Sequence, residues 1–385
     1  MALKVLIPFN TVSLYGMERG VIETFDLLRP EIDAHFLLSY TIREMNLPLL
    51  AELQGRGLEY SFFSDLQGWP RIAKPRSIID CWKMVRALVL GNRDVFKAAK
   101  DKDVIYLPGE RYFLFAILAS LRHRLQNREQ RIVYHFHDLI LTRSMLLGLV
   151  SHFVTDFVHN TELSRIAVTR PNAYLRKKQN WVIPCPIQPR LEIAANETVE
   201  IGSDTFNILF VGQIAKHKGI DLLLDAHELL RQSQPKVVLH IVGNYQDEDS
   251  AIRIKEAVYR NVGIKYWGYR DDVLEIMKMV DVYVHPSPPS RFSESFGRGV
   301  VEAMSTGTPV VCFRSGALEE IVIHEQTGLV CTEESAADLA RNLSRFLNSA
   351  DLRNRCGRLA RVEFEENYNS PSVKARWMEL FELKQ

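Results

Sequence analysis

The chain has 385 residues, 46% of them hydrophobic, which suits one large globular domain or two of ordinary size. Its five cysteines are odd in number and form no Cys-x-x-Cys pair, so we expect neither a disulfide framework nor a zinc site. The sequence contains no recognisable motif for binding nucleic acid. Because the first residues lack the basic flank and cleavage site of a signal peptide, we expect a cytoplasmic protein.

The net charge of +1 hides two unlike halves. Residues 1–190 contain 26 lysines and arginines against 18 aspartates and glutamates, a net charge of +8, whereas residues 191–385 contain 22 against 29, a net charge of −7. A basic first half favours an anionic acceptor or an anionic membrane surface as partner, rather than nucleic acid. The basic and aromatic side chains offered for that contact are Trp69, Arg71, Lys74, Arg76 and Trp82.

In the first half, short apolar runs alternate with stretches of helical periodicity. We predict strands at Leu3–Phe9, Ala34–Ser39, Val104–Leu107, Arg131–His135, Val154–His159 and Trp181–Ile187, and helices at 18–28, 45–53, 77–100, from Arg111 and from Asn160. Such alternation predicts a parallel sheet covered on both faces. The apolar run 112–121 is too short to span a bilayer, so we expect a buried helix there, with an interfacial anchor as the alternative.

Two places in this first half bear on chemistry. Gly16 stands in the loop between the first strand and the first helix, an arrangement that faces phosphate in open α/β sheets, although an ordinary tight turn has the same pattern. His135 and His137 close a strand, and alternation points both to one face at the end where ligands bind. With Asp138 they could suggest a metal, but no further ligands cluster nearby in the sequence, and a hydrogen-bonded core histidine is the simpler interpretation.

Residues 188–205 are rich in polar and small side chains and indicate a linker. The alternation then begins again, with strands predicted at Phe206–Val211, Lys236–Val242, Val262–Trp267 and Val282–His285. This pattern predicts a second α/β unit of nucleotide-binding size. Its first loop, 212–219, places Lys216 and Lys218 just before a helix, where lysine charge suits a diphosphate, although most surface lysines are simply solvated.

Residues 286–311 are predicted to form a loop, a short helix with Glu294 at its mouth and Glu302 two turns in, and a buried strand. Eight helical residues separate the two carboxylates by roughly 12 Å, too far for a glycosidase pair, which stands about 5 to 9.5 Å apart. They suit the two ends of one extended ligand, and the alternative is a capping Glu294 beside a solvated Glu302. Between them, backbone N–H groups of the first turn favour hydroxyl oxygens or phosphate. The residues of this turn are Ser295, Phe296, Gly297 and Arg298.

The phrase Glu294-Ser-Phe-Gly, followed by Glu302-Ala-Met and then by Gly-Thr-Pro-Val-Val, closely resembles the two-glutamate signature of the retaining nucleotide-sugar glycosyltransferases of family 4. Similar phrases occur along nearly the whole chain. The resemblance implies the α/β fold called GT-B, with two Rossmann-like domains facing across a cleft. It implies an acceptor-side domain at 1–190, a nucleotide-sugar domain at 205–365 and a C-terminal helix, 366–385, that crosses back to the first domain.

The resemblance also implies roles for single residues. Glu294 and the backbone amides of Phe296 and Gly297 would contact the donor sugar, while Lys218 would contact the diphosphate and Glu302 the ribose. His137 matches the family's histidine near the sugar, with His135 as the second choice. The implied catalytic residues are therefore His137, Lys218 and Glu294.

Some positions depart from the family pattern. Gln213 stands where the phosphate site usually has arginine, so Lys216 or Arg298 would have to compensate. Cys185 stands where an asparagine usually ends the first domain, and Gly16 is single where the family usually has paired glycines. The implied substrate contacts as a whole are Gly16, Gln213, Lys216, Ser295, Phe296, Gly297, Arg298 and Glu302.

The resemblance implies transfer of a sugar, with retention, from a nucleotide diphosphate sugar to a hydroxyl of a glycan or lipid-linked acceptor in polysaccharide or cell-envelope biosynthesis. A UDP-sugar is the first expectation, with GDP and ADP open. We expect no cofactor and no metal, and a cytoplasmic enzyme that contacts the inner membrane face peripherally. Small soluble acceptors are the alternative to a lipid-linked one. Two further alternatives are a nucleotide-sugar epimerase of the same fold and a catalytically silent nucleotide-sugar-binding subunit, which would tolerate Gln213.

Overall fold

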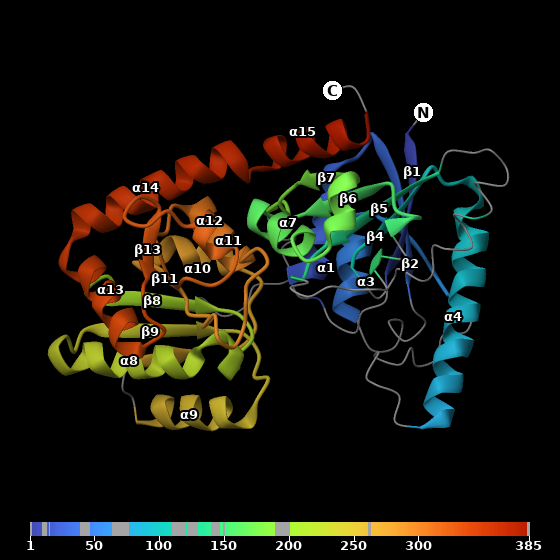
Figure 1. Ribbon diagram of the computed structural model, residues 1–385. Helices are drawn as coiled ribbons and strands as arrows, with labels where there is room; N and C mark the ends of the chain where they lie inside the picture. The colour runs from blue at the N-terminus through green and yellow to red at the C-terminus, as the bar shows by residue number, and fades with distance from the viewer. Residues whose placement is uncertain are drawn as a thin grey trace. The chain divides into compact units, whose positions relative to one another are not determined.

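The computed structural model describes residues 2–9, 14, 16–38, 47–63, 77–109, 121, 130–139, 147–148, 151–188, 201–260 and 263–382. It divides into two compact units, here termed unit 1 (Met1–Pro186 with Val373–Gln385) and unit 2 (Ile187–Ser372). Figure 1 labels most helices and strands of both. The loop at 69–76 that we singled out, nearly all of the apolar run at 112–121 and most of the expected linker lie outside the described residues.

Unit 1 is built on a seven-stranded sheet in the order β3-β2-β1-β4-β5-β6-β7, and every neighbouring pair is parallel. Its strands are β1 (Leu3–Phe9), β2 (Ile32–Leu38), β3 (Glu59–Phe62), β4 (Val104–Leu107), β5 (Arg131–Phe136), β6 (Asp156–His159) and β7 (Gln179–Val182). Its described helices include α1 (Gly16–Leu27), α3 (Leu47–Gly55), α4 (Ile78–Ala98), η1 (Ala99–Asp101), α7 (Glu162–Thr169) and η3 (Ala173–Lys177). The central strands are apolar because helices cover both faces of a parallel sheet.

The C-terminal helix α15 (Ser370–Leu380) contributes to the core of unit 1. Trp377 is fully buried, and its ring centroid lies 6.0 Å from that of Tyr106 and 5.8 Å from that of His135. Lys374 forms an ion pair of 2.9 Å with Glu31 at the surface. The end of the chain is therefore fixed to strands that lie more than 200 residues earlier in the sequence.

Unit 2 is built on a six-stranded parallel sheet in the order β10-β9-β8-β11-β12-β13. Its strands are β8 (Phe206–Val211), β9 (Val237–Val242), β10 (Ile264–Tyr266), β11 (Val282–His285), β12 (Val310–Phe313) and β13 (Gly328–Cys331). Its helices are η4 (Lys216–Lys218), α8 (Ile220–Ser233), α9 (Glu248–Tyr259), α10 (Val273–Met279), α11 (Arg298–Thr306), α12 (Leu318–Ile321), α13 (Ala336–Asn348) and α14 (Ala350–Asn367) among the described residues. The two parallel sheets with their helices confirm the predicted α/β class.

Several boundaries differ from the sequence prediction by a few residues, and two of the differences have a clear physical reason. The strand expected at Trp181–Ile187 is β7, which begins at Gln179 and ends at Val182. Pro184 and Pro186 lack the backbone N–H that a strand needs for its ladder, so pairing stops before them. The helix expected to begin at Glu294 begins only at Arg298, because Gly297 before it has a left-handed backbone conformation.

Candidate functional site

The candidate site lies in unit 2, in the loops that follow β8 and β11. These two strands are paired in parallel, with Val282 opposite Ile208, so their carboxyl ends reach the same edge of the sheet. Loop 212–219 leaves β8, and loop 286–297 leaves β11. In open α/β sheets, ligands bind at this edge.

Glu294 is the centre of this region. Only 6% of the residue is exposed, and its Oε1 atom accepts hydrogen bonds from Lys218 Nζ (2.7 Å), His285 Nε2 (2.9 Å) and Ser287 Oγ (2.7 Å). Burial alone would raise the pKa of Glu294, but the neighbouring His285 and Lys218 outweigh burial and hold that pKa well below its usual range. The site therefore contains a buried carboxylate that is ionised at neutral pH.

Lys218 reaches Glu294 because its loop packs tightly against the loop after β11. Gly219, which follows η4, has a φ of +73°, and a Cβ atom there would lie 1.7 Å from the carbonyl oxygen of Pro286. Only glycine fits such an approach. Lys218 Nζ also lies 3.9 Å from the centroid of the Phe292 ring, a cation–π contact. Two segments 76 residues apart are thereby fixed to each other around one ion pair.

Glu294 lies in a loop and not on a helix, which corrects the sequence prediction. Gly297 has a φ of +76° and immediately precedes α11, so the helical path cannot extend back to Glu294. A Cβ atom at Gly297 would lie 2.4 Å from Leu318 Cδ2. The helical spacing of roughly 12 Å between Glu294 and Glu302 is wrong for the same reason, because a rise of 1.5 Å per residue applies only within a helix.

Glu302 is also buried, which excludes the alternative of a capping Glu294 beside a solvated Glu302. It is 5% exposed, and its Oε1 atom accepts a hydrogen bond of 3.0 Å from Arg298 Nε, one turn earlier on α11. Phe296 is buried as well, with its ring centroid 6.3 Å from that of Tyr368. Arg298 and Glu302 thus form a second ion pair, on the helix that follows the Glu294 loop.

The remaining residues singled out in unit 2 form no hydrogen bond or ion pair with the Glu294 carboxylate within the described part of the chain. Lys216 is exposed, and its Nζ atom pairs at 3.3 Å with Asp249 on α9. Gln213 is half-buried in the loop after β8. Ser295 lies between Glu294 and Gly297 in the same loop. Of the two lysines before α8, only Lys218 contacts Glu294.

In unit 1, His135 and His137 lie where β5 ends, and their ring centroids are 4.1 Å apart. His135 uses both ring nitrogens, since Nδ1 is 2.6 Å from the Tyr106 hydroxyl and Nε2 is 2.9 Å from Asn160 Oδ1. Cys185 Sγ donates to the same Asn160 oxygen at 3.3 Å. The sequence interpretation of a hydrogen-bonded core histidine therefore describes His135.

His137 differs from His135 in its hydrogen bonding. Its Nε2 atom is buried, and no hydrogen-bond partner for it occurs among the described residues. Burial lowers the pKa of His137 to about 3, so its ring is neutral at physiological pH.

Gly16, also in unit 1, is exposed as the first residue of α1.

Sequence reasoning missed several residues that hold these groups in place. His285 and Ser287 bind Glu294, and Tyr106 and Asn160 bind His135. The available signal was a polar residue at the end of an otherwise apolar strand, as His285 is in β11. Their partners are distant in the sequence, so no local pattern indicates them.

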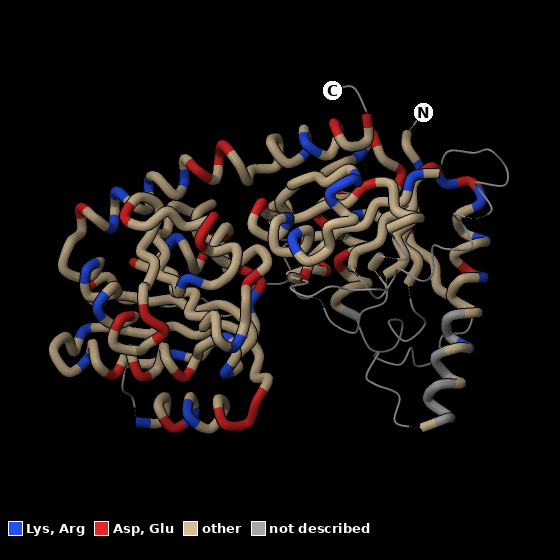
Figure 2. The backbone as a smooth tube through the Cα atoms, viewed as in Figure 1, with Lys and Arg blue, Asp and Glu red and all other residues tan. Residues whose placement is uncertain are grey.

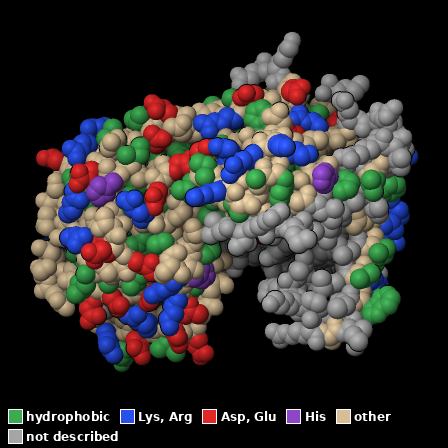
Figure 3. All heavy atoms as spheres, in the orientation of Figure 1, with side chains coloured by type: hydrophobic (Ala, Val, Ile, Leu, Met, Phe, Trp, Pro, Cys, Tyr) green, Lys and Arg blue, Asp and Glu red, His purple; other side chains and the backbone are tan. Residues whose placement is uncertain are grey.

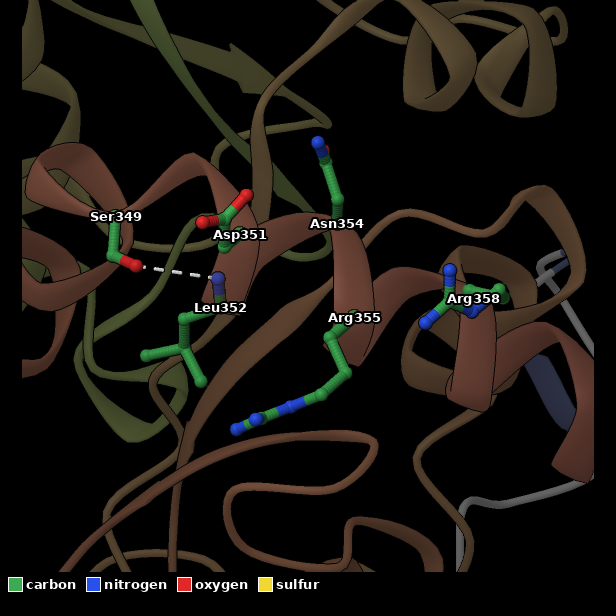
Figure 4. A pocket seen from close by; sticks show the side chains of 6 residues that line it. All are labelled: Ser349, Asp351, Leu352, Asn354, Arg355 and Arg358. Carbon is green, nitrogen blue, oxygen red and sulfur yellow. Dashed lines mark hydrogen bonds between the residues drawn. The ribbon is translucent and has the colours of Figure 1, made fainter.

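A pocket of about 660 Å³ lies elsewhere in unit 2, at the junction of α13 and α14 (Figure 4). Its lining residues are Ser349, Asp351, Leu352, Asn354, Arg355 and Arg358, none of which belongs to the Glu294 site. Within the described ranges, no group of three or more histidines, cysteines, aspartates or glutamates could hold a metal ion. The helices that the structure describes include none with the length and apolar character needed to cross a membrane.

Comparison with known sequences finds a family match in the second half of the chain. The family model for "Glycosyl transferases group 1" matches residues 194–363, which contain the whole Glu294 site. A D-inositol 3-phosphate glycosyltransferase of Pseudarthrobacter chlorophenolicus is 30% identical over 254 residues, covering 62% of this chain and 54% of that protein. A glycogen synthase of Mycobacterium tuberculosis is 30% identical over 170 residues, covering 43% and 40% of the two chains. The chain spans about half the length of the curated relatives it matches.

Solved structures show the same fold over both units. Anabaena Alr3699/HepE, determined in complex with UDP, superposes with a TM-score of 0.76 at 19% identity, covering 99% of this chain and 100% of that one. Sucrose-phosphate synthase from Thermosynechococcus elongatus superposes with a TM-score of 0.71 at 19% identity, covering 99% and 98%. Residues 194–363 are thus similar to the group 1 glycosyltransferases, and the chain has the GT-B fold of these structural neighbours.

Proposed function

We propose that the protein transfers a sugar from a nucleotide diphosphate sugar, with a UDP-sugar as the first choice, to a hydroxyl group of an acceptor, with retention at the anomeric carbon. The observation that carries this proposal is the buried, ionised Glu294 beside Lys218 at the strand ends of unit 2. A carboxylate that binds sugar hydroxyls and a cation that binds phosphate are the two groups that a nucleotide sugar requires. Related structures carry UDP and UDP-glucose, which favours this donor class.

In this reaction the bond between the anomeric carbon and the diphosphate oxygen breaks, and the acceptor oxygen forms the new bond. The acceptor's proton leaves with the diphosphate. We assign Glu294 and the backbone amides of Phe296 and Gly297 to the donor sugar, and Lys218 to the diphosphate. Catalysis then comes mainly from holding the reactants and from stabilising the negative charge of the departing diphosphate.

Glu302 and His137 complete the assignment. We assign Glu302 to the ribose, with Arg298 holding the carboxylate from the same helix. His137 is the residue of unit 1 that we assign to the sugar, because its buried Nε2 atom is without a partner among the described residues whereas both nitrogens of His135 are occupied. A polar atom that loses water without gaining a partner costs free energy, so a ligand hydroxyl is a favourable partner for it.

We propose that the reaction needs neither cofactor nor metal, with Lys218 supplying the positive charge at the diphosphate. Turnover in excess chelator should then equal turnover in buffer. Loss of activity in chelator, with recovery on adding Mn²⁺, would contradict this part of the proposal.

Titration calorimetry with UDP, GDP and ADP, followed by turnover assays over a donor panel, tests the activity and separates the alternatives. A transferase releases the nucleotide and glycosylates an acceptor, an epimerase isomerises the donor with no acceptor present, and a silent subunit binds the nucleotide without turnover. Failure of all three nucleotides to bind would overturn the donor assignment.

For the acceptor, we propose a lipid-linked or polyanionic glycan in polysaccharide or cell-envelope assembly, met at the inner membrane face. The net charge of +8 over residues 1–190 supports an anionic partner. So does the outer face of α4, where Trp82, Val85 and Val89 are exposed at helical spacing. The exposed charged side chains described on α4 are all basic: Arg86, Arg93 and Lys97. Figure 2 shows lysine and arginine positions in blue along the backbone of α4. Along α4, apolar and basic side chains reach the surface together (Figure 3).

Flotation with vesicles tests this contact. Each basic residue near an anionic surface contributes about 1 kcal/mol, so binding should require anionic lipid and weaken with salt. The variant W82S/V89S should float less than wild type. The control I252S alters an exposed apolar residue on α9 in unit 2 and should float like wild type. Equal recovery with neutral and anionic vesicles would rule the membrane contact out.

A further inference from the structure

His285 binds Glu294, and the proposed function gives His285 no role. It is the last residue of β11, it is largely buried, and its Nε2 atom is 2.9 Å from Glu294 Oε1. Its Nδ1 atom is 3.1 Å from the hydroxyl of Tyr283 on the same strand. The ring therefore stands between a buried carboxylate and a buried hydroxyl.

Tyr283 faces the Nδ1 atom of His285, and the ionised Glu294, which can only accept, requires a proton on Nε2. Burial, with further contributions from Glu302, Glu294 and Cys312, raises the pKa of Tyr283 well above its usual value, so the hydroxyl keeps its proton. The other acceptor near it, the carbonyl oxygen of Val211, is more distant at 3.4 Å. When the hydroxyl donates to Nδ1, the ring proton is on Nε2, which is the nitrogen that faces Glu294.

Tyr283 is itself fixed by the first turn of α11. A Cβ atom at Gly299 would lie 2.3 Å from the Tyr283 hydroxyl oxygen, so the helix backbone packs directly on that oxygen. Gly299 lies two residues after Gly297, whose backbone amide we assign to the donor sugar. Tyr283 thus connects the start of α11 with the histidine that holds Glu294.

The three donors to Glu294 all bind the same oxygen. Lys218, His285 and Ser287 reach Oε1, and within the described part of the chain no donor reaches Oε2. Of these donors, Lys218 also has the diphosphate to bind in the proposed reaction. Once its positive charge is shared with a ligand, Glu294 needs another firm partner if the carboxylate is to keep its orientation.

We propose that His285, held by Tyr283, is the positioning residue that keeps Glu294 Oε2 directed at the donor sugar while Lys218 binds the diphosphate. This inference rests on the proposed function, because it assumes that a nucleotide sugar occupies the site. The charged groups that contact His285 directly or through one residue are Glu294, which it binds, and Lys218 on η4, which binds the same carboxylate oxygen. Glu302 on α11 acts electrostatically on Tyr283, the partner of His285. A hydrogen bond through Nε2 is the feature required.

The test compares three replacements of His285 that differ in whether the new side chain has an N–H donor and where that donor lies. Glutamine places an N–H close to the position of Nε2, asparagine places one nearer Nδ1, and leucine has none. Calorimetry measures the dissociation constants of UDP and of the UDP-sugar with the highest turnover in the donor panel, and kinetics with that donor gives kcat and KM. H240L is the matched control, because His240 is a fully buried histidine of β9 outside the Glu294 site.

We expect every variant to bind UDP within about threefold of wild type, because UDP lacks the sugar that Glu294 contacts. H285L and H285N should lose about tenfold to a hundredfold in kcat/KM, the range for losing a hydrogen bond to a charged group, and H285Q should recover most of it. In the double variant E294Q/H285L the loss should not exceed that of E294Q alone, since His285 acts through Glu294.

Several results would overturn the inference. One is that H285L keeps the wild-type kcat/KM, and another is that H285Q and H285N lose activity equally, which indicates packing and not donation. A full additional loss in E294Q/H285L would also overturn it. If wild type binds none of the nucleotides, the proposed function fails instead. Should H285L not fold, the comparison of H285Q with H285N still decides the question.

Discussion

The two units hold their buried polar groups at the strand ends in opposite ways. In unit 2, Glu294 is buried as an ion, and Lys218 and His285 bind it directly. In unit 1, His135 and His137 are buried as neutral rings whose pKa values are lowered by burial. A buried group must either find an opposite charge or lose its own, and this chain uses both solutions.

The difference determines what each cluster can withstand. The Glu294 cluster depends on attraction across two loops, so it fails when one charge is removed and the other is left buried. The histidine cluster depends on hydrogen bonds between Tyr106, His135 and Asn160, so it fails when a charge is introduced. The predictions below alter these features in turn.

The largest effect is expected for E294Q. It removes the charge that Lys218 and His285 both contact, and breaking a buried ion pair costs about 3 to 5 kcal/mol. Because Lys218 is about one-fifth exposed, we expect the lower end of that range in urea denaturation, together with loss of donor turnover by at least about a hundredfold. The double variant E294Q/K218M should be more stable than E294Q. If the second change destabilises further, the pair does not work as described.

A smaller effect is expected for N160D. This change places a carboxylate beside a buried histidine of unit 1, as Glu294 lies beside His285 in unit 2. The new carboxylate would lie about 3 Å from His135 Nε2 and favour the protonated ring, which raises the pKa of His135 from its lowered value. A cation whose ring centroid lies 4.1 Å from that of His137 should reduce turnover by roughly tenfold. Histidine titrations followed by NMR check the pKa.

The matched control for N160D is N180D, because Asn180 accepts from His159 in the same way, at 3.1 Å, two strands from His135. It should raise the pKa of His159 from about 4 and leave turnover unchanged. Equal losses of turnover in N160D and N180D would mean that general damage to unit 1, and not charge beside His137, explains the result.

The buried histidines also predict how stability depends on pH. The pKa of His137 is about 3 in the folded chain, against 6.5 ordinarily, so between these values the unfolded chain binds more protons. The stability that the neutral His137 contributes is therefore fully present above pH 6.5, and it is lost as the pH falls below that value. From pH 7.5 to 5 one such histidine contributes a loss of about 2 kcal/mol. Urea denaturation of H137Q should show about that much less loss than wild type.

Glu294 does not interfere with that measurement. Its lowered pKa stabilises the folded chain above the ordinary value of 4.5, and this contribution is lost only as pH falls below that value. H240Q, in unit 2, should behave like H137Q, since the pKa of His240 is about 4. An equal loss in wild type and in both variants would show that these histidines are not neutral in the folded state.

The sequence predicted what depends on local pattern. Apolar runs located the buried strands, and the pattern of residues 286–311 indicated a loop, a short helix and a buried strand. It could not indicate where that helix begins, because Gly297 adopts a left-handed conformation and Leu318, 21 positions later, fills the space that a side chain at 297 would need. It also could not indicate the bond of His135 to Asn160, because that pairing exists only once β5 and β6 are adjacent.

The smallest effect separates the two lysines that the sequence offered as phosphate ligands. Lys216 is exposed and pairs with Asp249, whereas Lys218 lies against Phe292 and Glu294 in the site. Methionine keeps the length of either side chain while removing its charge. K216M should therefore change the dissociation constant of UDP by less than about threefold, as expected for an exposed pair, and K218M should weaken it by at least about tenfold. Calorimetry on the two variants is decisive, because the reverse order would place the diphosphate at the exposed end of η4 and away from the carboxylate on which the proposed reaction depends.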